Sequence, residues 1–305
     1  MEIYYEGTEI TGFVQTRKCV VRDVVGGRCD SLEIEFENAL GWYRWEPRED
    51  DKIIVAHNGY DTGVMYLNTI LPEDGRFRIL ATSLPCKVRK REYRSFSQKT
   101  IGEIMRACAI ADGMDYQLYG VAPETVIPYI QRENESSASF LHRLMKLEGA
   151  ALKCVNGRYV GIGYEYAQEQ AAQQTVELFA SHANHSYRRC GQTLYELVVE
   201  TPYANAAVHD IAVPENHQRA TINELPARTD AQAGRWARAL LAHKNRQCES
   251  LRLDSELNVG FTPMARIDVE GDTDANGQWL IEEAEHDFID MRSSALLRRC
   301  ITTIM

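Results

Sequence analysis

No run of apolar residues in this chain approaches the about 18 that a membrane-spanning helix needs. The N-terminal sequence MEIYYEGTEI also lacks the basic start and the apolar core of a signal peptide. We therefore expect a protein that is made and folds in a cytoplasm and that does not bind a membrane. Its 305 residues are enough for two or three domains with cores of their own.

A surplus of positive charge is also missing. The formal net charge is −10 and the pI is about 5.4, whereas a general nucleic-acid binder needs a basic surface that displaces counterions. One basic cluster, KVRKREYR at 87–94, stands against this acidic background. We interpret it as a solvated linker or a local ion-pair surface rather than a phosphate-binding site.

Signatures of common catalytic and metal sites are absent from the sequence. None of the eight cysteines forms C-x-x-C or pairs with histidine at zinc-finger spacing, and there is no H-E-x-x-H, G-x-S-x-G or P-loop. The cysteines are expected to be reduced thiols, with a Cys19–Cys29 disulfide across a hairpin as the alternative. His182 and His185 lie three apart in a polar segment, which favours a surface loop, and His286 is expected to make a structural hydrogen bond in a strand. We assign no catalytic, cofactor-binding or metal-binding residue and expect no cofactor.

The hydrophobic pattern divides the chain into three parts. Residues 1–95 alternate apolar and polar side chains between turn signals, which predicts a small β-barrel or sandwich. Residues 96–165 carry helical spacing, and residues 166–305 return to short alternating runs with a helix inserted around 229–246. The predicted class is α+β, mainly β: two small β-barrel domains flank a helical middle region, and a helix interrupts the second barrel. The β domain at each end suggests an internal repeat by architecture, although the sequence itself shows none.

The middle region contains start and stop signals for two helices and a hairpin. Thr100 and Glu103 form a capping-box pattern ahead of an apolar helical stripe. A serine pair can begin the second helix, and Gly149 stands where a glycine cap would end it. Asn156-Gly157 then lies between two short apolar runs, which predicts a type I′ hairpin.

This second helix and its hairpin resemble a recurring element of the phage late-control protein D family. That family forms the hub of contractile phage tails and is related to the hub part of type VI secretion spike proteins. Its pattern is (N/S)-(D/E)-x-x-F-x-x-R-L-x-x-x-E-G, and here the spacing from the acidic residue to the phenylalanine differs by a residue or two. The matching positions are Asn134, Glu135, Phe140, Arg143, Leu144, Glu148 and Gly149.

Further matches to the family follow in the same order along the chain. The N-terminal D-S-L strand, asparagine loop, tryptophan and proline before an acidic turn correspond to Asp30, Ser31, Leu32, Asn38, Trp45, Pro47 and Asp51. The aromatic-serine entry to the first middle helix corresponds to Phe96-Ser97. The C-terminal Gly, Pro, G-x-W-x-(V/I) and His correspond to Gly260, Pro263, Gly277, Trp279, Ile281 and His286.

The resemblance implies a structural role rather than an enzyme. Family hubs are homotrimers whose chains each supply two similar β-barrels, so that three chains form a pseudo-hexameric ring between the sixfold tail tube and the threefold spike. The implied partners are two further copies of the chain, the tail tube protein, the tail spike protein and other baseplate proteins. The implied location is a virion or tail-like particle assembled in the bacterial host cytoplasm. DNA would only pass through the lumen, where like charge would repel its phosphates.

A calcium-binding module is the sharpest alternative. The loop from Asp272 to Glu283 satisfies the D-x-D-x-N-G-x5-E pattern, with Asp274 and Asn276 as further oxygen ligands. An EF-hand needs a helix on each side, however, and both flanks of this loop are patterned like strands. If the second flank is extended, Glu283 points away from Asp272. A polar hairpin turn is therefore the favoured interpretation.

A cell-wall glycan hydrolase or binder is the second alternative. Paired acids could come from three glutamates around the second helix, although nothing in the sequence fixes their separation: Glu133, Glu135 and Glu148. An aromatic cluster could bind a sugar or a partner, although a core or interdomain role is favoured for it: Trp42, Tyr43 and Trp45.

Overall fold

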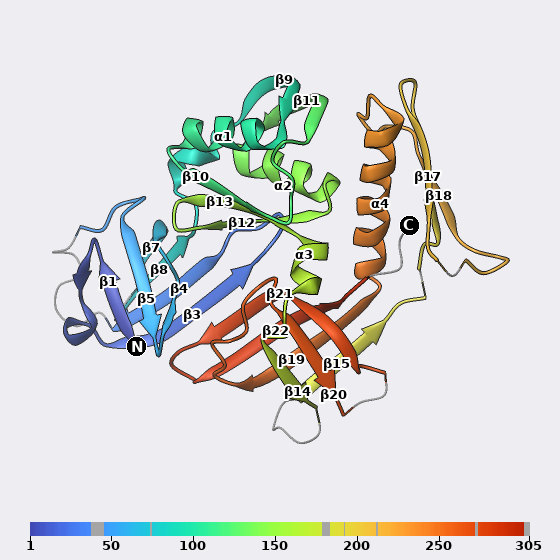
Figure 1. The fold of residues 1–305 in the computed structure, drawn as a ribbon. Helices are drawn as coiled ribbons and strands as arrows, with labels where there is room; N and C mark the ends of the chain where they lie inside the picture. The colour runs from blue at the N-terminus through green and yellow to red at the C-terminus, as the bar shows by residue number, and fades with distance from the viewer. Residues whose placement is uncertain are drawn as a thin grey trace.

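The structure is a computed structural model that describes residues 1–37, 46–73, 75–178, 184–191, 193–211, 213–271 and 274–301. Strands dominate, and the longer helices belong to the middle of the chain and to one later insertion (Figure 1). The predicted α+β, mainly β class is confirmed. Among the helices described, none is long and apolar enough to cross a membrane. All eight cysteines are free thiols, so the Cys19–Cys29 disulfide is not formed.

The N-terminal β half, residues 1–82, is built around one apolar core. Alternation forms it: Leu32, Ile34 and Phe36 point inward between acidic neighbours and are buried. Its six main strands are β1 (Glu2–Tyr5), β3 (Thr16–Val24), β4 (Ser31–Glu37), β5 (Lys52–His57), β7 (Met65–Glu73) and β8 (Arg76–Thr82). Two short strands are added, β2 (Thr8–Glu9) beside β1 and β6 (Tyr60–Asp61) beside β5.

The C-terminal β half has a second core, which contains Trp279 and Phe261. Its strands are β14 (Gln174–Glu177), β15 (Asn184–Arg189), β19 (Glu249–Glu256), β20 (Arg266–Glu270), β21 (Gly277–Asp287) and β22 (Arg292–Arg299). The sequence does not predict β15. The surface loop expected at His185 is wrong, because this residue lies within that strand, while His182 falls outside the described residues.

The two β halves share one strand order. If the six main strands of each half are numbered along the chain, they lie side by side as second, third, sixth, fifth, fourth and first. This order is β3-β4-β8-β7-β5-β1 in the N-terminal half and β15-β19-β22-β21-β20-β14 in the C-terminal half. Neighbours are antiparallel in both, except that β14 runs parallel to β20 where β1 runs antiparallel to β5. The repeat suggested by architecture is therefore present in the topology.

The strand register is repeated as well. One row of facing residues crosses the second, third, sixth and fifth strands of each half. In the N-terminal half the row is Val21, Leu32, Ala81 and Leu67, and in the C-terminal half it is Tyr187, Leu251, Leu297 and Ile281. The fifth strand of each half then carries a bulge one residue beyond the row, at Asn68 in β7 and at Glu282 in β21. Shared order, row and bulge make the halves two copies of one structural unit.

The middle region sets two helices against two small sheets. The helices are α1 (Ile101–Asp112) and α2 (Ser137–Leu147). One sheet pairs β9 (Glu92–Thr100) with β11 (Val126–Glu135), and the other holds β10 (Asp115–Tyr119), β13 (Arg158–Gly163) and β12 (Ala150–Val155). A short helix, α3 (Tyr164–Glu169), follows. The predicted domain boundaries near residues 95 and 165 lie within β9 and α3, and the division into three domains stays a prediction.

Local signals in the middle region act as the sequence predicts. Thr100 and Glu103 form the capping box of α1, and Ser136 accepts a hydrogen bond from the Ser139 N–H at the start of α2. Gly149 follows α2 with a φ of 71°. The turn from β12 to β13 has positive φ at both central residues, 50° at Asn156 and 67° at Gly157, as a type I′ hairpin requires.

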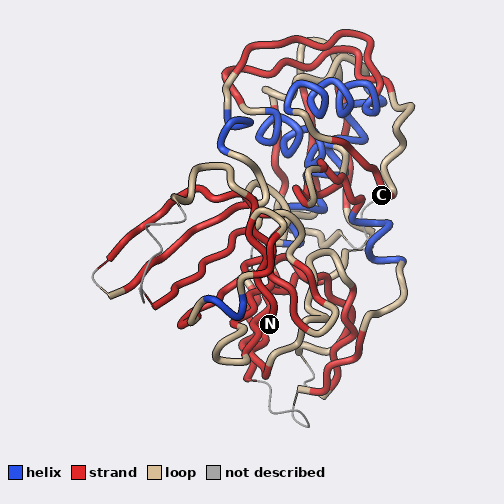
Figure 2. The backbone as a smooth tube through the Cα atoms, turned by 90° about the vertical axis from the view of Figure 1, so that its left-hand side faces the viewer, coloured by secondary structure: helices blue, strands red, loops and turns tan. Residues whose placement is uncertain are grey.

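The insertion between β15 and β19 is larger than the helix predicted there. It contains β16 (Glu196–Glu200), β17 (Asn205–His209), β18 (Arg219–Ile222) and α4 (Asp230–Arg246), the predicted helix. Trp236 and Leu241 of α4 are buried in the same core as Phe140 and Leu144 of α2. The insertion thus packs on the middle region, and most helices gather on one side of the molecule (Figure 2).

Phe140 tests this shared core. Its ring is fully buried and stacks on Phe96 with the ring centroids 5.5 Å apart. We expect Phe140→Ala to lower the free energy of unfolding by about 3–5 kcal/mol, because it removes buried apolar area and leaves a cavity. Urea denaturation followed by tryptophan fluorescence measures this loss. The control Ile110→Ala truncates an exposed side chain of α1 and should change stability by less than about 0.5 kcal/mol. Equal losses in the two variants would contradict the shared core.

Candidate functional site

The two β halves are joined through one strand, β21. Its first residues pair with β20, as in Trp279 opposite Ile267, whereas its last residues, Glu283 to Asp287, pair with β3 of the N-terminal half. The bulge at Glu282 lies between these two stretches and redirects the strand. β22 accompanies β21 through both, so one 14-stranded sheet runs through the two halves. We call the pairing of β3 with β21 the seam.

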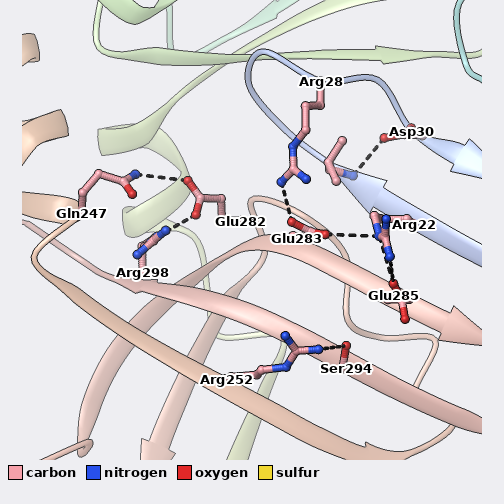
Figure 3. A network of polar contacts seen from close by, with 11 residues as sticks. Arg22, Arg28, Asp30, Gln247, Arg252, Glu282, Glu283, Glu285, Ser294 and Arg298 are labelled. Carbon is pink, nitrogen blue, oxygen red and sulfur yellow. Dashed lines mark hydrogen bonds and ion pairs between the residues drawn. The ribbon is translucent and has the colours of Figure 1, made fainter. Parts of the chain in front are cut away.

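Ion pairs lie beside the seam (Figure 3). Arg22 of β3 lies between Glu283 and Glu285 of β21, with its Nε 3.4 Å from Glu283 Oε1 and 2.9 Å from Glu285 Oε2. Arg28 also pairs with Glu283. Because both arginine side chains are about half exposed or more, these pairs fix the register of the seam more than they stabilise it.

The bulge has its own side-chain contacts (Figure 3). Glu282 accepts a hydrogen bond from Arg298 Nε at 2.6 Å and from Gln247 Nε2 at 3.2 Å. Arg298 belongs to β22 and Gln247 follows α4 directly. The bulge is therefore in contact with the end of the insertion as well as with the sheet.

On the buried side, the end of β21 closes the N-terminal core. Phe288, the next residue after β21, packs among the core residues of the N-terminal half. His286 is fully buried, with Nδ1 2.8 Å from Ser293 Oγ and Nε2 3.1 Å from the Phe261 carbonyl oxygen. Burial lowers the pKa of this imidazole. The structural hydrogen bond predicted for His286 is confirmed.

A buried ion cluster connects the middle region to the seam. Lys153 of β12 pairs with Asp23 of β3 and with Asp30, whose carboxylate oxygens lie 3.0 and 2.9 Å from Nζ. Asp30 also accepts the Val24 N–H at 3.0 Å. Burial raises the pKa of Asp30 to about 7, against the opposing attraction of Lys153. Burial would lower the pKa of Lys153, but the two carboxylates together hold it above its ordinary value.

Glu148 of the predicted signature forms a second connection. It accepts hydrogen bonds from Arg235 Nε and Trp236 Nε1 of α4, each at 2.7 Å. Its side chain is only 4% exposed. Arg143 of the same signature pairs with Glu135 at 3.0 Å. The signature residues therefore hold α2 against α4 and against the strand before it.

The glutamates considered for glycan hydrolysis do not form a facing pair of acids. A cleft of about 640 Å³ lies between the middle region and α4, and Glu148 is on its wall. Glu135 and Glu148 are bound by arginines, and Glu133 is not among the residues that line this cleft. Arg246 also lines the cleft, and its guanidinium carbon lies 3.6 Å from the centre of the Tyr164 ring. Burial lowers the pKa of the Arg246 guanidinium.

The loop considered for calcium is followed by a strand rather than by a helix. Glu283, which would close the site, lies within β21 and pairs with Arg22 and Arg28. Asp272 and Thr273 fall outside the described residues. Within the described ranges, no group of three His, Cys, Asp or Glu side chains is arranged to hold a metal ion.

Several residues named from the sequence also lie outside the described ranges, namely Asn38, Trp42, Tyr43 and Trp45. Conversely, sequence reasoning did not single out Lys153. Its signal is present, because it is the one charged residue in the otherwise apolar strand from Ala150 to Val155. A lone lysine in a buried strand indicates a buried partner carboxylate.

No protein-family model and no curated protein sequence matches this chain, but solved structures do. The 43 kDa tail protein of prophage MuSo2 from Shewanella oneidensis matches with a TM-score of 0.74 and 13% identity, covering 98% of this chain and 97% of that chain. The tail protein from Neisseria meningitidis MC58 matches with a TM-score of 0.77 and 11% identity, covering 98% and 95%. An E. coli component of the type VI secretion system is described as similar to T4 tail proteins gp27 and gp5. It matches with a TM-score of 0.62 and 12% identity, covering 97% of this chain and 76% of that chain. The chain therefore has the fold of phage tail proteins over nearly its whole length, and the fold implied by the sequence resemblance is confirmed.

Lys153 provides a test of the buried ion cluster. We expect Lys153→Met to lower the free energy of unfolding by about 3–5 kcal/mol at about pH 8, because two buried carboxylates lose their cation. The loss should shrink at about pH 5. At that pH Asp30 is protonated in the folded variant. In the unfolded chain its carboxyl, with a pKa of about 3.9, has already lost the proton. The folded state binds more protons in this range, so stability falls as the pH rises. Urea denaturation at the two pH values measures the difference.

The double variant Lys153→Met/Asp30→Asn is the matched control. It removes one of the two stranded carboxylates, so it should recover part of the stability and flatten the pH dependence. A loss for Lys153→Met that is the same at both pH values would contradict a charged cluster at this position.

Proposed function

We propose that this chain is a structural baseplate hub of a contractile phage tail or tail-like particle, and that it acts as a homotrimer without catalysis. The repeated β unit carries this proposal. Three chains with two units each supply six equivalent units, which suit a sixfold tail tube. The same ring has only three chains, which suits a threefold spike. One chain can thus form a ring that joins the two symmetries.

The construction of the seam supports this role. A ring of six units needs the two units of each chain at one fixed angle. Backbone hydrogen bonds between β3 and β21 fix the units edge to edge, and the Lys153 cluster holds the middle region against the same place. In this arrangement a continuous sheet, rather than a flexible linker, sets the angle between the two units.

The proposed partners are two further copies of the chain, the tail tube protein, the tail spike protein and other baseplate proteins. The fold shared with prophage tail proteins and with a type VI secretion component supports these assignments. The middle region and the insertion would face the spike or the baseplate periphery, since they lie to one side of the sheet (Figure 1). The particle would assemble in the bacterial host cytoplasm. With a net charge of −10, the ring would let DNA pass without binding it.

The mass in solution tests the proposed assembly. We expect light scattering of the purified protein to give about 100 kDa, three times the 34.7 kDa of one chain, because three chains complete the ring. The mass should be the same in calcium and in chelator. The mass of a single chain at every concentration would contradict the trimer, and a mass that depends on calcium would favour the calcium-binding alternative.

A further inference from the structure

The seam within one chain defines what each repeated unit offers to its neighbour. The N-terminal unit contributes its second strand, β3, and the C-terminal unit contributes its fifth strand, β21, beyond the bulge. If every contact around a ring were built alike, the C-terminal unit would offer its own second strand, β15. The N-terminal unit of the next chain would offer its fifth strand, β7, beyond its bulge at Asn68.

Both of these edges lack a strand partner in the described part of the chain. β15 pairs only with β19 and ends the path of the large sheet. β7 pairs with β8 along its length, but β5 reaches only Met65 and Tyr66, so Thr69 to Glu73 have one side open. An unpaired edge of this length is a template for strand addition from another chain.

Burial differs between the paired edge and its unpaired equivalent. Ala284 and His286 of β21, which lie in the stretch paired with β3, are completely buried. The residues that occupy the same positions beyond the bulge of β7 are Ile70, which is half-buried, and Pro72, which is exposed. A partner strand on β7 would lie beside Ile70 as β3 lies beside Ala284.

The direction of the backbone amides agrees with this pairing. Cys190 donates its N–H to the Cys248 carbonyl oxygen at 2.8 Å, on the β19 side of β15. Because amides alternate along a strand, Arg189 and Tyr187 point their N–H groups toward the opposite edge. Val21, the equivalent of Tyr187, faces β21 at the corresponding position of the seam.

We propose that β15 of one subunit pairs antiparallel with residues 69–73 of β7 in the next, which forms the contact between subunits of the trimeric hub proposed above and rests on that function. Carrying the register of the seam over, residue by residue, sets Leu71 opposite Arg188 and Ile70 opposite Arg189. Each ring then holds three seams within chains and three between chains.

The contact between subunits differs from the seam in its side chains. Arg188 stands where β3 has Arg22, but Thr69 and Leu71 stand where β21 has Glu283 and Glu285. Pro72 provides no N–H, a feature of edge strands that limits indiscriminate pairing. Fewer ion pairs and one missing donor make this contact weaker than the seam, as suits one that forms after each chain has folded.

A disulfide at the predicted register tests the contact. The variant Leu71→Cys/Arg188→Cys is oxidised as the trimer and run on a denaturing gel without reductant. Its band should shift from the mass of one chain to the masses of two and three linked chains. Facing residues in an antiparallel pair are within disulfide reach. In Leu71→Cys/Ser186→Cys the second cysteine moves two residues along the same face, about 7–8 Å from the first, and should not link. Arg22→Cys/Glu285→Cys should close a disulfide within one chain and leave the band at one chain.

Each outcome decides the proposal. Linked chains at Leu71 and Arg188 but not at Ser186 support it. A trimer that does not link there, or links equally at both positions, overturns the contact and leaves the trimeric hub standing. A single-chain mass throughout overturns both. Hydrogen exchange on the unaltered trimer gives a reading that needs no variant: the amides of Tyr187 and Arg189 should be protected, and fast exchange at both overturns the contact.

Discussion

The bulge at Glu282 is the constraint on which the architecture depends. Before it, the odd-numbered residues Trp279 and Ile281 point into the C-terminal core. After it, the even-numbered residues His286 and Phe288 are the buried ones, and Phe288 belongs to the N-terminal core. A strand of strict period two cannot change parity, and the extra residue at the bulge makes the change. One strand can therefore serve two cores, and the two β halves cannot move independently.

The middle region depends on the same place. Asp23, which pairs with Lys153, faces Ala284 across the seam, so the ion cluster lies directly beside the pairing of β3 with β21. At the far end of the same hairpin, Asn156 Oδ1 accepts the Val64 N–H at 2.9 Å. The hairpin from β12 to β13 thus contacts the N-terminal half both along β12 and at its turn. The helices are held by the sheet through this hairpin and through the insertion.

Whether a feature can be predicted from the sequence depends on how far along the chain its interactions reach. The capping box at Thr100, the glycine after α2 and the Asn156-Gly157 turn are local, and all three are observed as predicted. β15 is not predicted, because its sequence NHSYRR has a single apolar residue. It forms a strand only by pairing with β19, some 60 residues away. The Lys153 cluster and the seam join residues more than 100 positions apart, and no local pattern encodes them. The calcium pattern of residues 272–283 shows the converse: a local match that its surroundings do not support.

The repeat is invisible in the sequence because only part of each unit is constrained. Equivalent buried positions differ in size, as in Met65 against Trp279 and Ala81 against Leu297, because each half packs its own separate core. Strand order, register and bulge are properties of the backbone and survive such exchange. In the proposed trimer, the sixfold and the threefold contacts depend on different parts of the chain. The β unit occurs twice per chain and would meet a sixfold partner through its backbone shape, while the middle region and the insertion occur once and would be available only to a threefold one. A single chain can present both because the duplicated units form one continuous sheet and the unique parts lie to one side of it.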